Sequence, residues 1–385
     1  MMMEAFFWPG RATSGLRNLL LPPVPYAWLI FSVMIINYDC RHFKGHIPCS
    51  YHKLDGIHCE GCPHYDQVIE RIIIIKLGAL GDVIRTTPLI EALKAAHPKS
   101  QLFWLTYSPE FLPSTVDRRL PFTLESITYL EQVPFDILIN LDKDVEACAL
   151  ARQLKAEKRF GFTLHNGVPA PVNELAEHKF QTGLFDDIGQ SNTKSYPQEI
   201  FEICGYTFNG EKYALAFEEN SFQWSLPKGG AVIGLNTGCG RRWLTRLWPE
   251  AYWAELADEL LKKGYRVLLL GGPDEHEKNL RIQADSGALY QGTFPLKQFV
   301  SLINQCDLVV TTVTMALHLA IALEKKIVLL NNIFNRHEFE LYGLGQILEP
   351  PNCTCYFAQT CDKGCMEDLK VSEILNAVTA LQPAK

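Results

Sequence analysis

The chain alternates short apolar runs of strand length with longer amphipathic stretches of helix length. In the first half these runs predict strands at 71–76, 102–106 and 136–141, and helices up to about Ala96 and at 145–155. Pro88 is expected to kink or restart the first of these helices, because proline has no amide hydrogen for the helical ladder. Strands that alternate with helical crossovers are typical of a parallel sheet.

A less regular region follows, and a second alternating block comes after it. Within 161–222 we predict a loop at 182–192 and a short helix at 197–204, and the proline and glycines of 225–230 indicate a linker. In the second block we expect strands at 231–235, 266–270, 308–311 and 327–330, and helices at 249–263, 274–284, 296–305 and 314–323. Two such halves form a cleft, where parallel sheets bind ligands beyond the carboxyl ends of their strands. The sequence therefore predicts an α/β fold with two Rossmann-like domains, at 67–225 and 226–350.

Length and charge narrow the classes of function. At 385 residues the chain suits two domains, and its apolar fraction of 47% is that of a globular protein. A net charge of −7 argues against general nucleic-acid binding, which gains affinity by neutralising phosphates, but it is compatible with a local basic pocket.

The leader, 1–36, is treated apart from the fold. Its apolar stretch contains Pro22, Pro23 and Pro25, which leave too few uninterrupted apolar residues to span a membrane. Three interpretations stay open: an extension upstream of a true start at Met34, an interfacial anchor, or a signal peptide.

The first candidate site is the segment KLGALGDVIRT at 76–86. Gly78 and Gly81 allow the backbone to approach a ligand closely, and Asp82 stands at a helix start. The carboxylate of Asp82 could accept the proton of an attacking hydroxyl group. The alternative is that Asp82 caps the helix, since aspartate is a preferred residue at that position.

The second candidate site lies at 235–253, where small residues and arginines stand between a strand and a helix. Backbone N–H groups of 237–240 and the helix terminus could bind an anion. Arg241, Arg242 and Arg246 would add the charge-assisted hydrogen bonds that arginine forms with phosphate. The alternative is a solvated basic loop beside stacking tryptophans.

Two further turns follow strands of the second block. Glu275 or Glu277, in the segment 270–279, could bind ribose hydroxyls, although the helix dipole also favours acidic residues at a helix start. Thr314 is suited to cap the next helix at the cleft. His318 lies one turn further in, either as a ligand-binding residue or as a packed core residue.

Together, KLGALGDVIRTTP, the arginine-rich loop that ends in RLWPEAYW, GGPDEHEKN and TTVTMALHLA resemble the heptosyltransferases of lipopolysaccharide assembly, glycosyltransferase family 9. The resemblance runs from about residue 71 to residue 345. It implies the GT-B fold, in which two Rossmann-like domains with parallel sheets face a central cleft. It also implies an inverting enzyme that moves a heptose from an ADP-sugar onto a lipid-linked core oligosaccharide.

The resemblance assigns roles to residues of this chain. Asp82 matches the general base of the family, and Arg246 falls where the family places a basic residue on the donor phosphates. Further donor contacts are expected from Asn236, Thr237, Gly238, Arg242, Glu275, Thr314, Met315, Ala316 and His318. Acceptor contacts are expected from Gly78, Gly81, Asp142, Asp144 and Lys194. Because Arg246 and a helix terminus would stabilise the leaving diphosphate, no catalytic metal is expected.

Two positions on the donor side depart from the family pattern. Val313 stands where the family usually has an aspartate before the helix threonine. The segment 331–335, NNIFN, replaces a Gly-Pro-Thr sequence after the last strand. The fold and the reaction type are still implied, but the donor sugar stays open.

Eight of the twelve cysteines form two groups outside the region of resemblance. Cys40, Cys49, Cys59 and Cys62 lie in the segment 37–66, and Cys353, Cys355, Cys361 and Cys365 lie in the segment 351–385. Four cysteines close in sequence suit a tetrahedral structural zinc site, with iron–sulfur ligation and unligated thiols as alternatives. In GT-B enzymes the last helices return to the first domain, which would make the two groups neighbours.

Two other functions fit the same scaffold. A nucleotide-sugar 2-epimerase would act on the donor alone, and a zinc-stabilised binding protein would transfer nothing. For the transferase we expect a nucleotide-sugar donor, a lipid-linked glycan acceptor and no nucleic-acid partner. We also expect a cytoplasmic location, with peripheral contact to the inner membrane surface.

Overall fold

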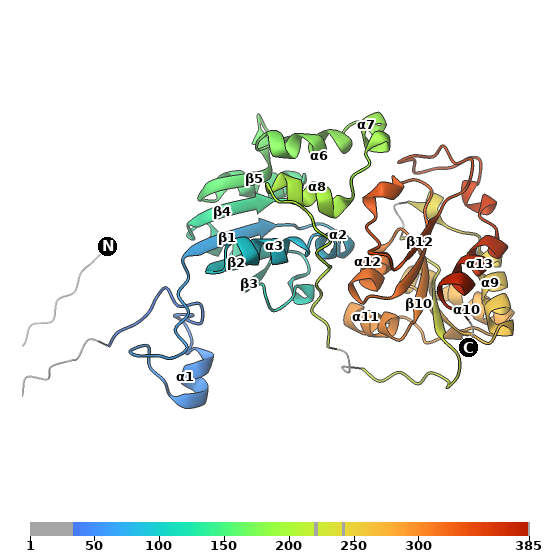
Figure 1. The fold of residues 1–385 in the computed structure, drawn as a ribbon, viewed down its shortest axis with the longest axis horizontal. Coiled ribbons are helices and arrows are strands. Elements are labelled where there is room, and N and C mark those ends of the chain that lie inside the picture. Colours follow the sequence, from blue (N-terminus) through green and yellow to red (C-terminus); the bar gives the residue numbers. More distant parts are fainter. Residues whose placement is uncertain (1–33, 219–221, 241–242, 384–385) are drawn as a thin grey trace, which may run out of the picture.

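The structure is a computed structural model that describes residues 34–218, 222–240 and 243–383. The predictions for the leader up to residue 33 and for Arg241 and Arg242 lie outside these residues. The described chain forms two α/β halves side by side, and a small N-terminal segment lies beyond the first half (Figure 1). No helix among the described residues is long and apolar enough to cross a membrane.

The first half is built on a six-stranded sheet with the order β3-β2-β1-β4-β5-β6. Its strands are β1 (Glu70–Ile75), β2 (Ser100–Thr106), β3 (Arg118–Pro121), β4 (Phe135–Asn140), β5 (Ala156–His165) and β6 (Val168–Pro171). All neighbours run parallel except the β5–β6 hairpin. The three strands predicted from apolar runs are confirmed. Of the other three, β3 and β5 contain charged residues at exposed or half-buried positions, and β6 is a four-residue strand with two prolines, so their sequences gave no clear strand pattern.

The helices of the first half are α1 (Ser50–Asp55), α2 (Leu80–Ile84), α3 (Leu89–Ala96), α4 (Leu124–Leu130), α5 (Val145–Gln153), α6 (Glu177–Thr182), α7 (Asp186–Ser191) and α8 (Tyr196–Ile203). The helices predicted for this half are confirmed as α2 with α3, α5 and α8, whereas α1, α4, α6 and α7 were not predicted. The restart at Pro88 is confirmed, because this residue is the N-cap of α3. The loop predicted at 182–192 is wrong in part. Gly189 of α7 packs so close to Tyr356 that an added Cβ would meet its hydroxyl at 2.7 Å, a contact from distant sequence.

The second half repeats the architecture with a parallel sheet of order β12-β11-β10-β7-β8-β9. Its strands are β7 (Val232–Asn236), β8 (Arg266–Leu270), β9 (Leu289–Tyr290), β10 (Leu308–Thr312), β11 (Lys326–Leu330) and β12 (Gly345–Leu348). Its helices are α9 (Glu250–Lys262), α10 (His276–Ser286), α11 (Leu296–Asn304), α12 (Met315–Ala322) and α13 (Val371–Leu381). The predicted strands and helices of this block are confirmed, and the short edge strands β9 and β12 were not predicted.

The last helix does not return to the first half. The apolar face of α13, with Val371 and Ile374, joins the core that contains Trp253 of α9. The Trp248 indole also donates a hydrogen bond to the Leu369 carbonyl at 2.9 Å, just before this helix. The expectation from GT-B enzymes is therefore wrong here. The two cysteine groups are not neighbours, because one lies in the N-terminal segment beside α1 and the other in the loop that precedes α13 on the second half (Figure 1).

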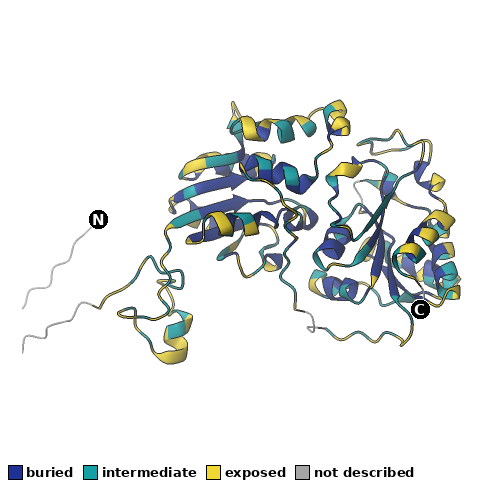
Figure 2. Cartoon of the chain, in the orientation of Figure 1, coloured by how far each residue is buried: buried dark blue, intermediate teal, exposed yellow. Residues whose placement is uncertain are grey.

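Both sheets are covered by helices, so the strands are buried while the outer helix faces are exposed (Figure 2). A further apolar cluster joins the two halves, because Leu80 and Ile84 of α2 pack with Leu317 and Ala320 of α12. This contact brings the glycine turn before α2 opposite the start of α12. Both elements follow the carboxyl ends of central strands, where a site is expected in parallel sheets.

Candidate active site

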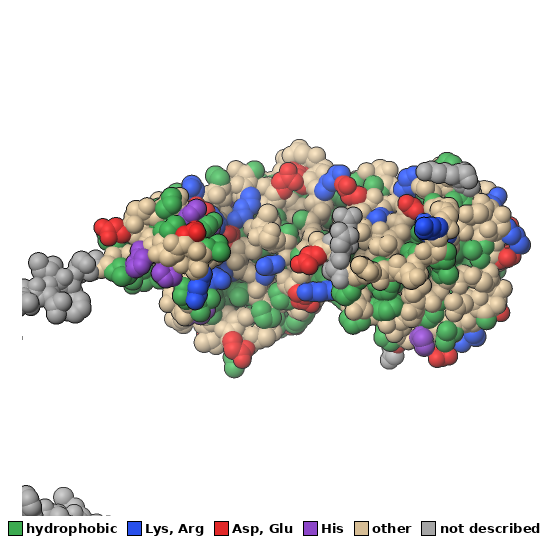
Figure 3. All heavy atoms as spheres, turned by 90° about the horizontal axis from the view of Figure 1, so that it is seen from below, with side chains coloured by type: hydrophobic (Ala, Val, Ile, Leu, Met, Phe, Trp, Pro, Cys, Tyr) green, Lys and Arg blue, Asp and Glu red, His purple; other side chains and the backbone are tan. Residues whose placement is uncertain are grey.

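A cleft of about 680 Å³ lies between the two halves. On the face shown in Figure 3, acidic and basic side chains gather near the junction of the halves. The cleft is lined by ten residues that the sequence singled out: Gly81, Asp82, Asn236, Gly238, Arg246, Glu275, Thr314, Met315, Ala316 and His318. The structure therefore brings most of the predicted base and donor residues into one space.

Asp82 lines the cleft from the first turn of α2. The N-cap of this helix is Ala79, and no side chain caps it, so the alternative that Asp82 is the capping residue is wrong. The carboxylate instead lies 2.8 Å from the guanidinium of Arg85, three residues further on, and its side chain is 38% exposed. Asp82 is thus held in place by a charge pair and still accessible from the cleft.

The electrostatic surroundings keep Asp82 ionised. Desolvation would raise the pKa of its carboxyl, but the charges on Arg85 and Lys76 outweigh this effect, so the pKa lies below its ordinary value. The opposite holds for His318, whose pKa is lowered to about 3, mainly by burial and also by Arg85. At neutral pH the cleft therefore contains a carboxylate beside an uncharged imidazole.

Arg85 was not predicted as a site residue. Its guanidinium lies 3.6 Å from the centre of the Tyr196 ring and 3.9 Å from the carboxylate of Glu338, and it lines the cleft. The spacing of three residues from Asp82 was the available signal, since side chains three apart share one face of a helix. The contacts to Tyr196 and Glu338, which are distant in sequence, were not predictable from this spacing.

The glycine turn is anchored from below by Asp142. This carboxylate is buried, pairs with Lys76, and accepts hydrogen bonds from the amides of Leu77 and of Gly78, the latter at 3.2 Å. Gly81, at the other end of the turn, lies against His318, where an added Cβ would meet the ring at 2.8 Å. The turn is therefore fixed by a buried ion pair on one side and by close packing with α12 on the other.

The predicted acceptor residues are mostly outside the cleft. The Asp142 carboxylate already pairs with Lys76 beneath the glycine turn, and the Lys194 ammonium group forms an ion pair with the Glu202 carboxylate at 2.5 Å. The cleft is not lined by Gly78, Asp142, Asp144 or Lys194. Of the five predicted acceptor residues, the cleft brings only Gly81 beside Asp82.

Arg246 lies on the opposite wall and is buried. Its guanidinium donates hydrogen bonds to three carbonyl oxygens, those of Val313, Cys239 (2.6 Å) and Trp243 (3.4 Å). No carboxylate among the described residues pairs with it, and desolvation lowers the pKa of this guanidinium. A buried cation without an acidic partner is costly, so this position favours an anionic ligand.

The start of α12 lies beside Arg246. Thr314 is the N-cap of this helix, and its hydroxyl accepts a hydrogen bond from the Ala316 amide at 3.2 Å. The Asn236 side chain donates to the hydroxyls of Thr314 at 3.2 Å and of Thr311 at 3.0 Å. These bonds fix a helix N-terminus, which carries a partial positive charge, on the cleft wall.

The loop after β8 places Glu275 in the cleft. An added Cβ on Gly238 would meet the Glu275 carboxyl carbon at 2.2 Å, so only glycine leaves room for this side chain. The Gly272 amide donates to the Glu275 carboxylate at 2.9 Å. Thr237 faces away from the cleft, because its hydroxyl donates to the Asn279 side chain at 2.6 Å. Its predicted direct donor contact is not supported by this orientation.

The segment 331–335, which departs from the family pattern, forms hydrogen bonds at the junction between the halves. The buried Asn335 side chain donates to the carbonyls of Gly189 at 2.8 Å and of Asn192 at 2.6 Å, both in the first half. The Asn332 side chain donates to the Thr245 carbonyl at 2.7 Å, beside the arginine loop. The segment that stands in place of the family's Gly-Pro-Thr thus contributes hydrogen bonds between the halves through Asn335.

Among the described residues, six aromatic ones line the cleft and were not predicted as site residues, and three of them, Trp243, Phe334 and Phe357, pack together. The centre of the Phe357 ring lies 5.9 Å from that of the Trp243 ring and 5.3 Å from that of the Phe334 ring, in edge-to-face arrangements. The Arg246 guanidinium lies 5.5 Å from the Phe334 ring. Their positions in three separate loops explain why no sequence pattern revealed them.

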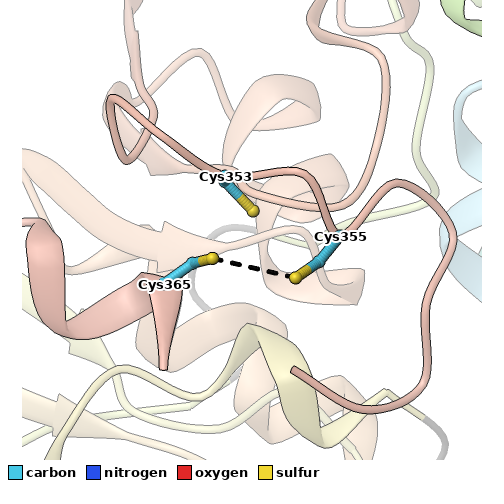
Figure 4. Close-up of side chains that lie close together, drawn as sticks. All are labelled: Cys353, Cys355 and Cys365. Carbon is cyan, nitrogen blue, oxygen red and sulfur yellow. Dashed lines mark hydrogen bonds between the residues drawn. The ribbon is translucent and has the colours of Figure 1, made fainter. Parts of the chain in front are cut away.

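The two cysteine groups differ in geometry. The sulfur atoms of Cys353, Cys355 and Cys365 lie within 4.8 Å of one another, and the residues are drawn in Figure 4. The four cysteines of the first group line one small cavity of about 30 Å³ in the N-terminal segment. Within the described part of the chain, the second group alone has three ligand atoms that close together.

Two Rossmann-like halves, with a carboxylate on one wall of their cleft and a basic pocket on the other, have the architecture of the GT-B fold. The family model of glycosyltransferase family 9 (heptosyltransferase) matches residues 125–343, more than half of the chain. The chain belongs to this family.

Curated relatives match parts of the chain. Lipopolysaccharide heptosyltransferase 2 of Salmonella typhimurium is 31% identical over 144 residues, 36% of this chain and 40% of that protein. Lipopolysaccharide heptosyltransferase 1 of Pseudomonas aeruginosa is 23% identical over 237 residues, 56% of this chain and 64% of that protein. The chain thus spans less than two thirds of the length of these relatives.

Solved structures share the fold at low sequence identity. The glycosyltransferase family 9 protein of Veillonella parvula has a TM-score of 0.63 with 19% identity, over 82% of this chain and 98% of that chain. The ADP-heptose lipopolysaccharide heptosyltransferase II of E. coli has a TM-score of 0.60 with 18% identity, over 81% and 98%. These likenesses confirm the predicted GT-B fold.

Proposed function

We propose that the chain is an inverting glycosyltransferase that moves a sugar, heptose or a related one, from a nucleoside diphosphate to a hydroxyl group of a lipopolysaccharide-type glycan. The observation that carries the proposal is that Asp82 and Arg246 line one cleft from opposite walls. Family membership and the names of the relatives support the substrate class.

The donor diphosphate binds at Arg246. Within the described ranges the hydrogen-bond partners of this guanidinium are carbonyl oxygens, so an anionic oxygen would supply the negative charge that the site lacks. The first turn of α12, at Thr314, Met315 and Ala316, adds the positive end of a helix dipole. Glu275 stands on the same wall as an acceptor for the hydroxyl groups of a ribose.

The acceptor hydroxyl binds beside Asp82. Its oxygen attacks the anomeric carbon while its proton passes to the Asp82 carboxylate. The bond between that carbon and the diphosphate oxygen breaks, and the diphosphate leaves with the electron pair. Because the hydroxyl attacks from the face opposite the leaving group, the configuration inverts. Arg246 and the α12 terminus stabilise the charge that grows on the diphosphate, so this step needs no catalytic metal.

Replacement of the base tests this proposal. With ADP-heptose and truncated lipopolysaccharide as substrates, Asp82→Ala should lower kcat by about 10²–10⁴-fold, because proton removal by a positioned side chain contributes this much. The affinity for ADP, measured by calorimetry, should stay unchanged. Glu157→Gln, at an exposed carboxylate of β5, is the matched control. Undiminished turnover by Asp82→Ala would exclude Asp82 as the base.

The same assay separates the rival functions. A 2-epimerase would change the donor with no acceptor present, and a binding protein would retain ADP without product. A lipid-linked acceptor also requires the cytoplasmic protein to reach the inner membrane surface, so sedimentation with acceptor-containing vesicles is expected.

For the N-terminal segment we propose a structural zinc site. Its four cysteines line one cavity, and no side chain of residues 37–66 is buried in the structure. A segment without a core of its own needs a metal or another cross-link to hold its shape. Zinc analysis of a Cys59→Ser/Cys62→Ser variant, expected to lose one equivalent, tests this site.

A further inference from the structure

The four cysteines of the C-terminal group converge in a loop that has little other support. The sulfur of Cys361 lies 2.9 Å from that of Cys355 and 3.3 Å from that of Cys365. The sulfur atoms of Cys355 and Cys365, joined by the dashed line in Figure 4, are 3.7 Å apart. Cys353 completes the group within 4.8 Å of Cys355 and Cys365. Among residues 351–365, Cys365 alone is buried, so the loop has no apolar core.

These distances suit one metal ion better than other arrangements. Four thiolates at about 2.3 Å from a tetrahedral ion lie about 3.8 Å from one another. The Cys355–Cys365 separation of 3.7 Å matches this value, and the two separations to Cys361, 2.9 and 3.3 Å, are shorter. A disulfide needs sulfur atoms about 2.05 Å apart, and all four cysteines are free thiols. An iron–sulfur cluster places its own irons and sulfides between the thiolates and needs them further apart.

We infer that Cys353, Cys355, Cys361 and Cys365 bind a single tetrahedral metal ion, and that this ion holds an aromatic turn in the wall of the cleft. The turn consists of Tyr356 and Phe357, which lie between the second and third of these cysteines. The part of the inference that concerns the cleft rests on the proposed donor site, whereas metal binding does not.

Phe357 connects the cysteine loop to the donor wall. Its ring is 42% exposed, lines the cleft, and packs against Trp243 and Phe334. Its backbone has a φ of 50°, which is unfavourable for a side chain of this size, and its amide donates to the Ile333 carbonyl at 2.9 Å. A conformation of this kind persists only where the surroundings impose it, and the adjacent thiolate site would do so.

The same loop also touches the first half. The Tyr356 hydroxyl lies so close to Gly189 of α7 that an added Cβ there would meet it at 2.7 Å. The Thr245 hydroxyl donates to the Ala358 carbonyl at 3.0 Å and ties the loop to the arginine segment. The metal site therefore lies in a loop that lines the cleft on the second half and also contacts α7 of the first half. Loss of the ion should weaken donor binding without altering Asp82 or Arg246.

Metal analysis of the anaerobically purified full chain tests the site itself. The Cys355→Ser/Cys361→Ser variant should contain one metal equivalent fewer than the wild type, whatever the N-terminal group holds. Cys148→Ala, at a buried cysteine outside both groups, should lose none. Visible absorption of an iron tetrathiolate, or its absence with zinc present, identifies the ion, and either result supports the site. Unchanged metal content, or inorganic sulfide lost together with several irons, would overturn it.

Where the double variant does not fold, the wild type supplies the same information. Titration with a mercurial should release one ion as the four C-terminal thiols react, which peptide mapping of the modified cysteines identifies. Reaction of these four thiols without release of metal would contradict the inference.

Calorimetry with ADP tests the link to the cleft. The metal-depleted variant should bind ADP about two- to tenfold more weakly, the size of one lost aromatic contact. Phe357→Leu should show a similar loss while it keeps its metal, which a general unfolding effect would not produce. Loss of metal with unchanged ADP affinity would refute the link. If the wild type itself does not bind ADP, the proposed donor site fails and the metal site stands.

Discussion

The two walls of the cleft differ in whether their charged side chains have partners of opposite charge. On the first wall the charges are paired: Asp82 with Arg85, and Asp142 with Lys76 beneath the turn. On the second wall Arg246 is buried among carbonyl oxygens without an acidic partner among the described residues. The difference suits the two tasks. A base must be present and oriented before the acceptor arrives, whereas a phosphate site gains selectivity by leaving its cation without a carboxylate.

The largest expected effect concerns the buried pair of the first wall. Asp142→Asn should reduce the free energy of unfolding by about 3–5 kcal/mol, because it leaves the Lys76 charge buried and unpaired. Denaturant unfolding measures this change. The Lys76→Met/Asp142→Leu variant, which removes both charges, should recover much of the loss. If Asp142→Asn is as stable as the wild type, the pair does not anchor the turn.

The second prediction addresses the unpaired wall. Arg246→Ala should lower kcat/KM by about 10²–10³-fold, as expected for a group that stabilises charge in the transition state, and should weaken ADP binding as well. Arg246→Lys keeps the charge but loses the forked geometry, so its loss should be smaller. Steady-state kinetics and calorimetry together separate this variant from Asp82→Ala, which should keep its ADP affinity. If Arg246→Ala binds ADP as tightly as the wild type, Arg246 does not bind the donor phosphates and the proposed contrast between the two walls is wrong.

The smallest expected effect is the pH dependence of stability caused by His318. Its pKa is lowered to about 3 by burial, whereas the unfolded chain takes up this proton near pH 6.5. Stability is therefore complete above about pH 6.5 and should fall by roughly 1.4 kcal/mol per pH unit below it. His318→Gln, which does not titrate, should show a smaller fall between pH 6.5 and pH 5. Parallel curves for the two proteins would show that His318 is not buried as described.

Local patterns were sufficient for much of the fold and for the centre of the site. Apolar runs revealed β1 and β8 because buried parallel strands are apolar on both faces. Asp82, in the first turn of α2 after β1, and Arg246, in the segment between β7 and α9, were predictable because both segments follow the carboxyl end of such a strand, where sheet topology brings them to the cleft. The resemblance to the family then selected the catalytic role for Asp82 over the capping role.

Residues that depend on contacts between distant segments were not predictable. Asp142 was expected at the acceptor, but its position beneath the turn follows from the pairing of β1 with β4. Phe357 and Asn335 lie in loops without periodicity, and their partners are far away in sequence. The path of α13 was wrong because it was inferred from the fold class, whereas the apolar face of this helix matches the core around Trp253.

The position of α13 also determines how the halves are connected. Since this helix stays on the second half, the described residues show one passage from the first half to the second, after α8 and before β7. In an architecture with a returning helix, two covalent connections would act together as a double hinge. Here the width of the cleft depends on side-chain contacts alone, chiefly the packing of α2 on α12 and the hydrogen bonds of Asn335. The two halves therefore associate as two linked binding partners do, and the connecting segment sets the effective concentration of one half at the other.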